Sequence, residues 1–143
     1  MKIPVEVFAR HIHISLKDLE SLFGENYKLT KLRNLTQPSG FAAKETLDVE
    51  VNGKTIKNVR IVGPIRKKTQ IEISLTDAVY FSIKPVLRNS GDIKDSSSAF
   101  LIGPKKRIRI KEGLIVPLRH IHCNFDEAKK LGLKKRRFCF CYG

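Results

Sequence analysis

The sequence has no tryptophan, one methionine, three cysteines and half as many acidic as basic residues, 14 against 28. No apolar run approaches the roughly 18 residues that a membrane-spanning helix needs, and no signal-peptide pattern opens the chain. Three cysteines, with Cys139 and Cys141 crowded at the end, do not form the disulfide framework of a small secreted domain. We therefore expect no membrane association and a cytoplasmic location.

The excess of basic residues gives a formal net charge of +14, which attracts polyanions. Basic residues gather at 105–111 and 134–137, and in the first block they alternate with Ile108 and Ile110. Alternation at period two predicts a strand with one basic, solvated face. A nucleic-acid-binding module is the alternative interpretation. It would place aromatic side chains between the basic ones, where this strand has isoleucines, so we expect no nucleic-acid partner.

The tetrapeptide Arg-His-Ile-His occurs twice, at residues 10–13 and 119–122. In both copies a helix-capping residue stands five positions after the arginine, Ser15 in the first and Asn124 in the second. Apolar spacing typical of a short helix follows Ser15, a capping box with Glu127 follows Asn124, and a glycine ends both segments. Internal duplication of a strand–helix unit is the economical explanation.

Between the two copies the pattern is mostly β. Residues 47–51 alternate between apolar and polar, and Asn-Gly at 52–53 is typical of a type I′ hairpin turn. A second hairpin is predicted around 103–104, and a short turn or helix after Ser74. We expect a mainly β fold of duplicated small β-barrels with short capped helices.

A chain of 143 residues, 41% hydrophobic and 29% charged, is expected to form one globular domain. The glycine- and serine-containing stretch 89–98 is the best candidate for a connector between halves. We divide residues 1–143 into a first barrel half at about 1–92, a partial second half at about 93–133 and an atypical tail at 134–143.

All the histidines of the chain lie in the two repeated motifs. Residues i and i+2 of a strand project from the same face, so each motif offers two neighbouring imidazoles while its isoleucine turns toward the core. Neutral imidazole is a good ligand for zinc and related divalent metals. If the halves meet across a pseudo-twofold axis, the two pairs converge on one metal site: His11, His13, His120 and His122.

Two further residues are candidates for this site. Glu72 lies between two isoleucines, which predicts that it lines a polar surface, although a plain exposed strand glutamate gives the same pattern. Arg66 follows Gly63-Pro64-Ile65, and a bend before an arginine is able to present its guanidinium to phosphate.

Five segments carry a resemblance to a known family: RHIHISLKDLESLFG, LTQPSGFAAKET, NVRIVGPIRKKTQIEISLTDA, VLRNSGDI and PLRHIHCNFDEAKKLGL. The chain resembles the PduL family, the phosphate propanoyltransferases, from about residue 3 to residue 133. The resemblance implies two β-barrels related by duplication, a zinc site of two ions between them, and reversible transfer of an acyl group between coenzyme A and phosphate.

The resemblance also assigns roles to single residues. Arg66 matches the residue that holds phosphate, and acyl-CoA and phosphate become the expected partners. Family members divide between the cytosol and the lumen of bacterial microcompartments, and the early first strand favours the cytosol here. The implied metal ligands are His11, His13, Glu72, His120 and His122. The implied coenzyme A contacts are Arg33, Arg60 and Ser90.

The resemblance ends after Leu133. Family members continue with further strands and one more histidine ligand, whereas residues 134–143 are basic and then cysteine-rich. We expect a premature end, an incomplete second barrel whose exposed strand edges favour pairing into a homodimer, and low or no activity. The alternatives are an inactive truncated relative and a cupin-like metal-binding protein, which would not need the motif twice.

Overall fold

The computed structural model describes residues 8–36, 40–120 and 124–133. Strands dominate it, which confirms the mainly β prediction, and its three helices are short. In chain order the elements are β1 (His11–His13), α1 (Leu16–Phe23), β2 (Lys31–Asn34), β3 (Phe41–Val51), β4 (Lys54–Gly63), β5 (Gln70–Glu72), α2 (Leu75–Tyr80), β6 (Leu87–Arg88), β7 (Ser97–Ile102), β8 (Arg107–Pro117) and α3 (Phe125–Lys130).

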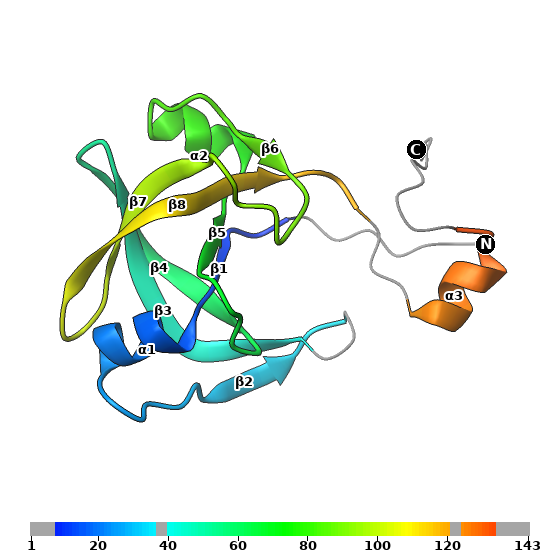
Figure 1. Ribbon diagram of the computed structural model, residues 1–143, viewed down its shortest axis with the longest axis horizontal. Coiled ribbons are helices and arrows are strands. Elements are labelled where there is room, and N and C mark those ends of the chain that lie inside the picture. The colour runs from blue at the N-terminus through cyan, green and yellow to red at the C-terminus, as the bar shows by residue number, and fades with distance from the viewer. Residues whose placement is uncertain (1–7, 37–39, 121–123, 134–143) are drawn as a thin grey trace.

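Six of the strands close into a mixed β-barrel (Figure 1). The order around the ring is β3, β4, β1, β5, β8 and β7, and β7 pairs again with β3. The pairs β1–β4 and β5–β8 are parallel, and the other pairs of the ring are antiparallel. Outside the ring, β2 extends from β3 and β6 pairs with β8. Closure removes the unpaired edges that an open sheet would leave.

The strands that complete the ring lie beyond the boundary that we placed at about residue 92. β7 pairs with β3 and β8 pairs with β5, so part of the stretch 93–133 completes the same barrel that contains β1. After β8, the described residues contribute α3, which buries none of its side chains and lies apart from the barrel in Figure 1. They contain no second ring of strands, and the duplication of barrels stays a prediction.

Local signals in the sequence produced the expected turns and caps. Asn52 and Gly53 have φ of 50° and 74°, the left-handed geometry of a hairpin turn, and join β3 to β4. The hairpin predicted around 103–104 joins β7 to β8. Ser15 caps α1 by accepting a hydrogen bond from the amide of Asp18, and Ser74 and Asn124 each form a capping box at the start of α2 and α3.

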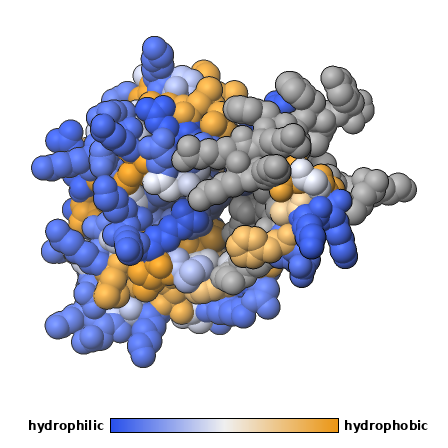
Figure 2. Space-filling view, turned by 45° about the vertical axis from the view of Figure 1, so that its right-hand side comes forward, coloured by the Kyte–Doolittle hydropathy of each residue, from blue (hydrophilic) through white to orange (hydrophobic). Residues whose placement is uncertain are grey.

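The core lies inside the barrel and under α1. Ile12 and Ile71 are fully buried on neighbouring strands, and Leu19 and Leu22 of α1 are fully buried against the barrel. On the outside, β8 begins with exposed basic residues that alternate with half-buried or buried isoleucines, as predicted. Figure 2 shows a mainly hydrophilic surface with scattered apolar groups. Within the described residues, no helix is long and apolar enough to cross a membrane.

Candidate metal centre

Strands β1 and β5 place four polar side chains on one face of the sheet. The two strands are antiparallel neighbours in which His11 lies opposite Glu72 and His13 lies opposite Gln70. Ile12 lies between the two histidines, and its side chain points to the other face and into the core. Because residues alternate between the two faces of both strands, the polar side chains form the cluster on one face while Ile12 and Ile71 are buried in the core on the other.

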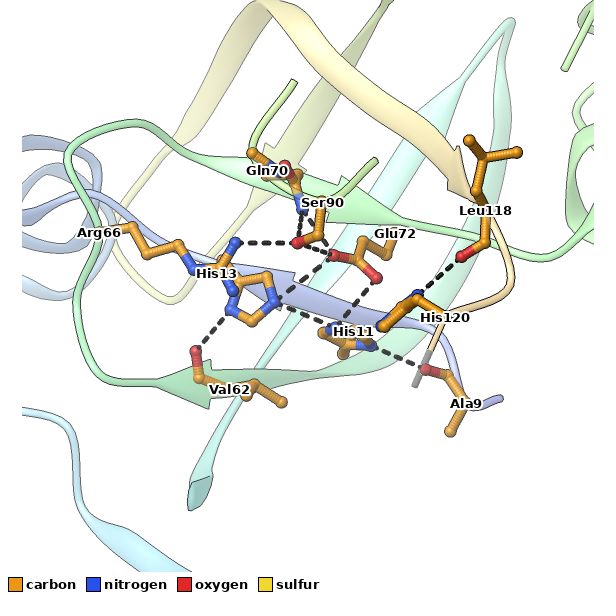
Figure 3. A network of polar contacts seen from close by, with 11 residues as sticks. Ala9, His11, His13, Val62, Arg66, Gln70, Glu72, Ser90, Leu118 and His120 are labelled. Atoms are coloured by element: carbon orange, nitrogen blue, oxygen red, sulfur yellow. Dashed lines mark hydrogen bonds and ion pairs between the residues drawn. The ribbon is translucent and has the colours of Figure 1, made fainter. Parts of the chain in front are cut away.

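The cluster brings three side chains of types that can bind a metal close together (Figure 3). His11 Nε2 lies 3.2 Å from His13 Nε2 and 3.4 Å from Glu72 Oε2, and His13 Nε2 lies 3.6 Å from Glu72 Oε1. One donor atom from each residue falls within 4.8 Å of the others. His13 and Glu72 are buried, and His11 is half-buried and forms the more accessible side of the cluster.

Backbone carbonyls determine the tautomers of both histidines. His11 Nδ1 lies 2.8 Å from the carbonyl oxygen of Ala9, and His13 Nδ1 lies 3.3 Å from that of Val62. A carbonyl oxygen only accepts, so the ring nitrogen that faces it carries the proton. Each neutral imidazole then presents the lone pair of Nε2 to the other and to a carboxylate. Two lone pairs and a negative charge at this spacing repel one another, and a divalent cation between them removes the repulsion.

The donor set fits zinc. Two imidazole nitrogens and one carboxylate oxygen are a known catalytic zinc set, which leaves a coordination position open to substrate or water. Burial raises the pKa of Glu72, but when the histidines are protonated, hydrogen bonding from His13 and Ser90 and the histidine charges outweigh burial and lower this pKa to about 2. Burial lowers the pKa of His11, against the opposing charge of Glu72. Burial of His11 favours its neutral imidazole, and hydrogen bonds from Gln70 and Ser90 favour the ionised carboxylate of Glu72; these are the forms that bind metal.

Arg66 and Ser90 adjoin the cluster, as Figure 3 shows. Arg66 lies in the segment between β4 and β5, where its amide donates to the carbonyl of Ile14 at 2.9 Å. Its Nη1 donates to Ser90 Oγ at 3.1 Å, and Ser90 Oγ donates to Glu72 Oε1 at 2.9 Å. The Arg66 guanidinium is thus connected to the cluster through the Ser90 hydroxyl. Its positive charge lies beside the cluster, where it can bind an anion.

The other two predicted arginines do not join this network. Arg60 pairs in register with His11, but its Nη1 donates to the carbonyls of Ala43 and Lys44 at 3.1 and 2.8 Å. Arg33 is exposed on β2, a strand that pairs only with β3 among the described residues. Their predicted contact with coenzyme A stays a prediction.

The second histidine pair is only partly described. His120 is exposed in the segment after β8, and its Nδ1 lies 2.7 Å from the carbonyl of Leu118. In the view of Figure 3 its ring overlaps that of His11, but it does not belong to the cluster of mutually close donors. His122 lies outside the described residues, so the convergence of both pairs stays a prediction.

One residue of the site was absent from our candidates. Gln70 is 2% exposed, and its Nε2 donates to Glu72 Oε1 at 2.6 Å and to Ser90 Oγ at 3.0 Å. A signal for it was present in the sequence: Gln70 stands two positions before Glu72 in the same strand, and therefore shares its face.

The geometry describes a small β-barrel protein with a candidate two-histidine, one-carboxylate metal centre beside an arginine. The family model for phosphate propanoyltransferase matches residues 4–140, and the chain belongs to this family. This membership decides against the cupin-like alternative.

Named relatives agree with the family model. The chain is 43% identical over 132 residues to the phosphate propanoyltransferase of Thermotoga maritima, covering 92% of this chain and 63% of that protein. It is 47% identical over 132 residues to that of Priestia megaterium, covering 92% and 61%. The protein of the same name from Lachnoclostridium phytofermentans is 44% identical over 133 residues, covering 92% and 62%. The chain thus spans about three fifths of the length of these relatives.

Proposed function

We propose that this chain carries the first metal-binding half of a phosphate acyltransferase, which transfers a short acyl group between coenzyme A and phosphate. The observation that carries the proposal is the cluster of His11, His13 and Glu72, with both Nε2 atoms free to bind metal and an ionised carboxylate beside them. Family membership supplies the reaction, and the cluster supplies a place for its metal.

The reaction needs no nucleophilic side chain. A phosphate oxygen forms a bond to the acyl carbon, the carbon–sulfur bond breaks, and the thiolate of coenzyme A leaves with the electron pair. A zinc ion, when bound, supplies Lewis acidity to the acyl oxygen and a soft partner for the thiolate. The chain itself has to hold two anionic substrates close together.

Arg66 is the residue that we assign to phosphate. It is half-buried, and its Nη1 reaches Ser90 Oγ, which in turn reaches Glu72. Burial lowers the pKa of Arg66 below its usual value, while the charge of Glu72 raises it, and the guanidinium stays charged at neutral pH. The charged guanidinium, close to the cluster of His11, His13 and Glu72, offsets the charge of an incoming phosphate. The family resemblance implies that Arg33, Arg60 and Ser90 lie near the phosphates of coenzyme A. We keep this assignment for the two arginines, because the Ser90 hydroxyl already bonds to Glu72, Gln70 and Arg66.

We also propose that the second motif begins a second copy of the same unit and supplies His120 and His122 to the same metal site, which then holds two ions. The local geometry of His120 supports this, because its Nδ1 faces the carbonyl two residues earlier, as that of His11 does. Asn124 caps a helix at the position where Ser15 caps α1. The same ring nitrogen facing a carbonyl and a capped helix at the same position support this proposal.

The test is thiol release from propanoyl-CoA or acetyl-CoA by the purified, zinc-loaded chain, measured with and without phosphate. We expect phosphate-dependent release at a low rate, which H11A abolishes and which R66A lowers mainly through a higher KM for phosphate. Arg109 is an exposed arginine on β8, in a part of the strand that pairs with β7, so R109A is the matched control and should behave as the wild type.

Zinc binding without phosphate-dependent release would contradict the activity and identify an inactive relative. Equal effects of R66A and R109A would contradict the role of Arg66, because a general loss of positive charge would then explain both.

A further inference from the structure

Gln70 has an amide whose orientation is fixed by three hydrogen bonds. Its Nε2 donates to Glu72 Oε1 at 2.6 Å and to Ser90 Oγ at 3.0 Å, and its Oε1 accepts from the amide of Gly91 at 2.7 Å. Rotating the amide by half a turn would place its oxygen against a carboxylate and its NH₂ group against an N–H. Since a residue 2% exposed cannot exchange these partners for water, only one orientation is satisfied.

This orientation decides which oxygen of Glu72 faces the cluster opening. The hydrogen bonds from Gln70 and Ser90 both go to Oε1, while Oε2 lies 3.4 Å from the Nε2 of His11. With Oε1 engaged by two donors, Oε2 is the oxygen that presents its lone pairs to a metal. Gln70 therefore favours a single-oxygen contact between Glu72 and the metal.

The same amide also holds the segment that carries Ser90. The Ser90 hydroxyl donates to Glu72 and accepts from Gln70 and Arg66, which fills its one donor and two acceptor positions. The bond from Gly91 to Gln70 fixes the backbone beside it. Gln70 thus contacts the carboxylate of Glu72 directly and is connected to Arg66 through the hydroxyl of Ser90.

We propose that Gln70 is a positioning residue that orients Glu72 toward the metal through Oε2 and holds Ser90 between Glu72 and Arg66. The proposal rests on the proposed function, because it names how one further residue prepares the same site. Partners that hold a metal ligand through hydrogen bonds are worth roughly 10–100-fold in metal affinity or activity.

Two variants separate the bonds that the NH₂ group of Gln70 donates from the bond that its oxygen accepts. Q70M keeps much of the length and volume but removes every hydrogen bond of the side chain. Q70E keeps an oxygen that can accept from Gly91, but replaces the donor that faces Glu72 by a second carboxylate oxygen. The matched control is T69V at the neighbouring position, where Thr69 is 4% exposed and bonds to Ser15 and Asp18 instead of the cluster.

The experiment is a titration of the full chain with Co²⁺, read from the d–d absorption bands, together with hydrogen exchange at the Gly91 amide in the metal-free protein. We expect Q70M and Q70E to bind Co²⁺ roughly 10–100-fold more weakly, with a changed band shape. Exchange at Gly91 should accelerate in Q70M and stay slow in Q70E. T69V should lower stability and leave affinity and bands unchanged.

Wild-type affinity and bands in Q70M and Q70E would overturn the positioning role while leaving the metal site in place. The same loss of affinity in T69V as in Q70M would also overturn it, since destabilisation alone would then account for the effect. A wild-type chain that binds no Co²⁺ would refute the proposed function and the metal part of this role together. Unchanged exchange at the Gly91 amide in Q70M would refute only the part of the proposal in which Gln70 holds the segment that carries Ser90.

Discussion

Removing the charge of Glu72 should remove most of the stabilisation that zinc gives to the fold. E72Q keeps the size of the side chain and replaces a buried, ionised oxygen donor by a neutral amide. Glu72 is also the only anionic member of the described cluster. Loss of a supporting hydrogen bond to a ligand already costs roughly 10–100-fold in affinity, so loss of the charged ligand is expected to cost at least about 100-fold.

This change in affinity converts into a shift in melting temperature. Zinc at about 100 times its Kd stabilises the folded state by about 2.7 kcal/mol. For 143 residues, an unfolding entropy of about 2.1 cal/mol/K per residue makes each kcal/mol worth about 3 °C. Wild-type chain should therefore gain about 9 °C from this concentration of zinc. A variant with about 100-fold weaker binding gains about 0.4 kcal/mol, which is about 1 °C.

The assay is thermal unfolding followed by circular dichroism, with and without zinc. The control is E45Q, because Glu45 is a second buried carboxylate, which accepts hydrogen bonds from Tyr27 and Thr30 away from the cluster. E45Q should lower the melting temperature of the zinc-free chain but retain the full zinc increment. An E72Q chain that gains as much from zinc as the wild type would refute the assignment of Glu72 as a ligand.

Two further predictions concern stability and pH. T69V should lower the free energy of unfolding, measured in urea, by about 1–3 kcal/mol. The reason is that the Thr69 hydroxyl accepts a hydrogen bond from the amide of Ser15 at 2.9 Å and donates one to Asp18 at 2.5 Å. An unchanged urea concentration at the midpoint of unfolding would contradict this. Zinc affinity should be independent of pH above the ordinary histidine pKa of 6.5, because burial lowers the pKa of His11 and protons compete with zinc for this ring only at lower pH. A zinc affinity that already falls between pH 8 and about 6.5 would contradict this.

Much of the centre could be predicted because strand periodicity is a local property. A His-Ile-His strand places two imidazoles on one face whatever the rest of the fold does, and isoleucines on both sides of Glu72 give the same alternation. The structure pairs these two strands in the register that brings His11 opposite Glu72. The caps at Ser15 and Asn124 were predictable for the same reason, since capping depends on neighbours within one turn.

Long-range pairing could not be predicted from such patterns. β7 and β8 follow a connector with serine and glycine, which resembles a boundary, but they close the first barrel by pairing with β3 and β5. The contacts of Arg60 could not be predicted for the same reason. Its guanidinium donates to two carbonyls of β3, a partner that the residue pattern of β4 does not reveal. Gln70 shares a strand face with Glu72, but the pattern did not make it a candidate because a glutamine amide is not a usual zinc ligand.

The most direct test of the metal centre is the zinc content of the purified chain after dialysis, compared with that of the H11A/H13A double variant. The cluster predicts that the wild type retains stoichiometric zinc and that the double variant loses the zinc held between β1 and β5. A wild-type chain without zinc, or a double variant with an equal content, would contradict a metal centre at His11, His13 and Glu72.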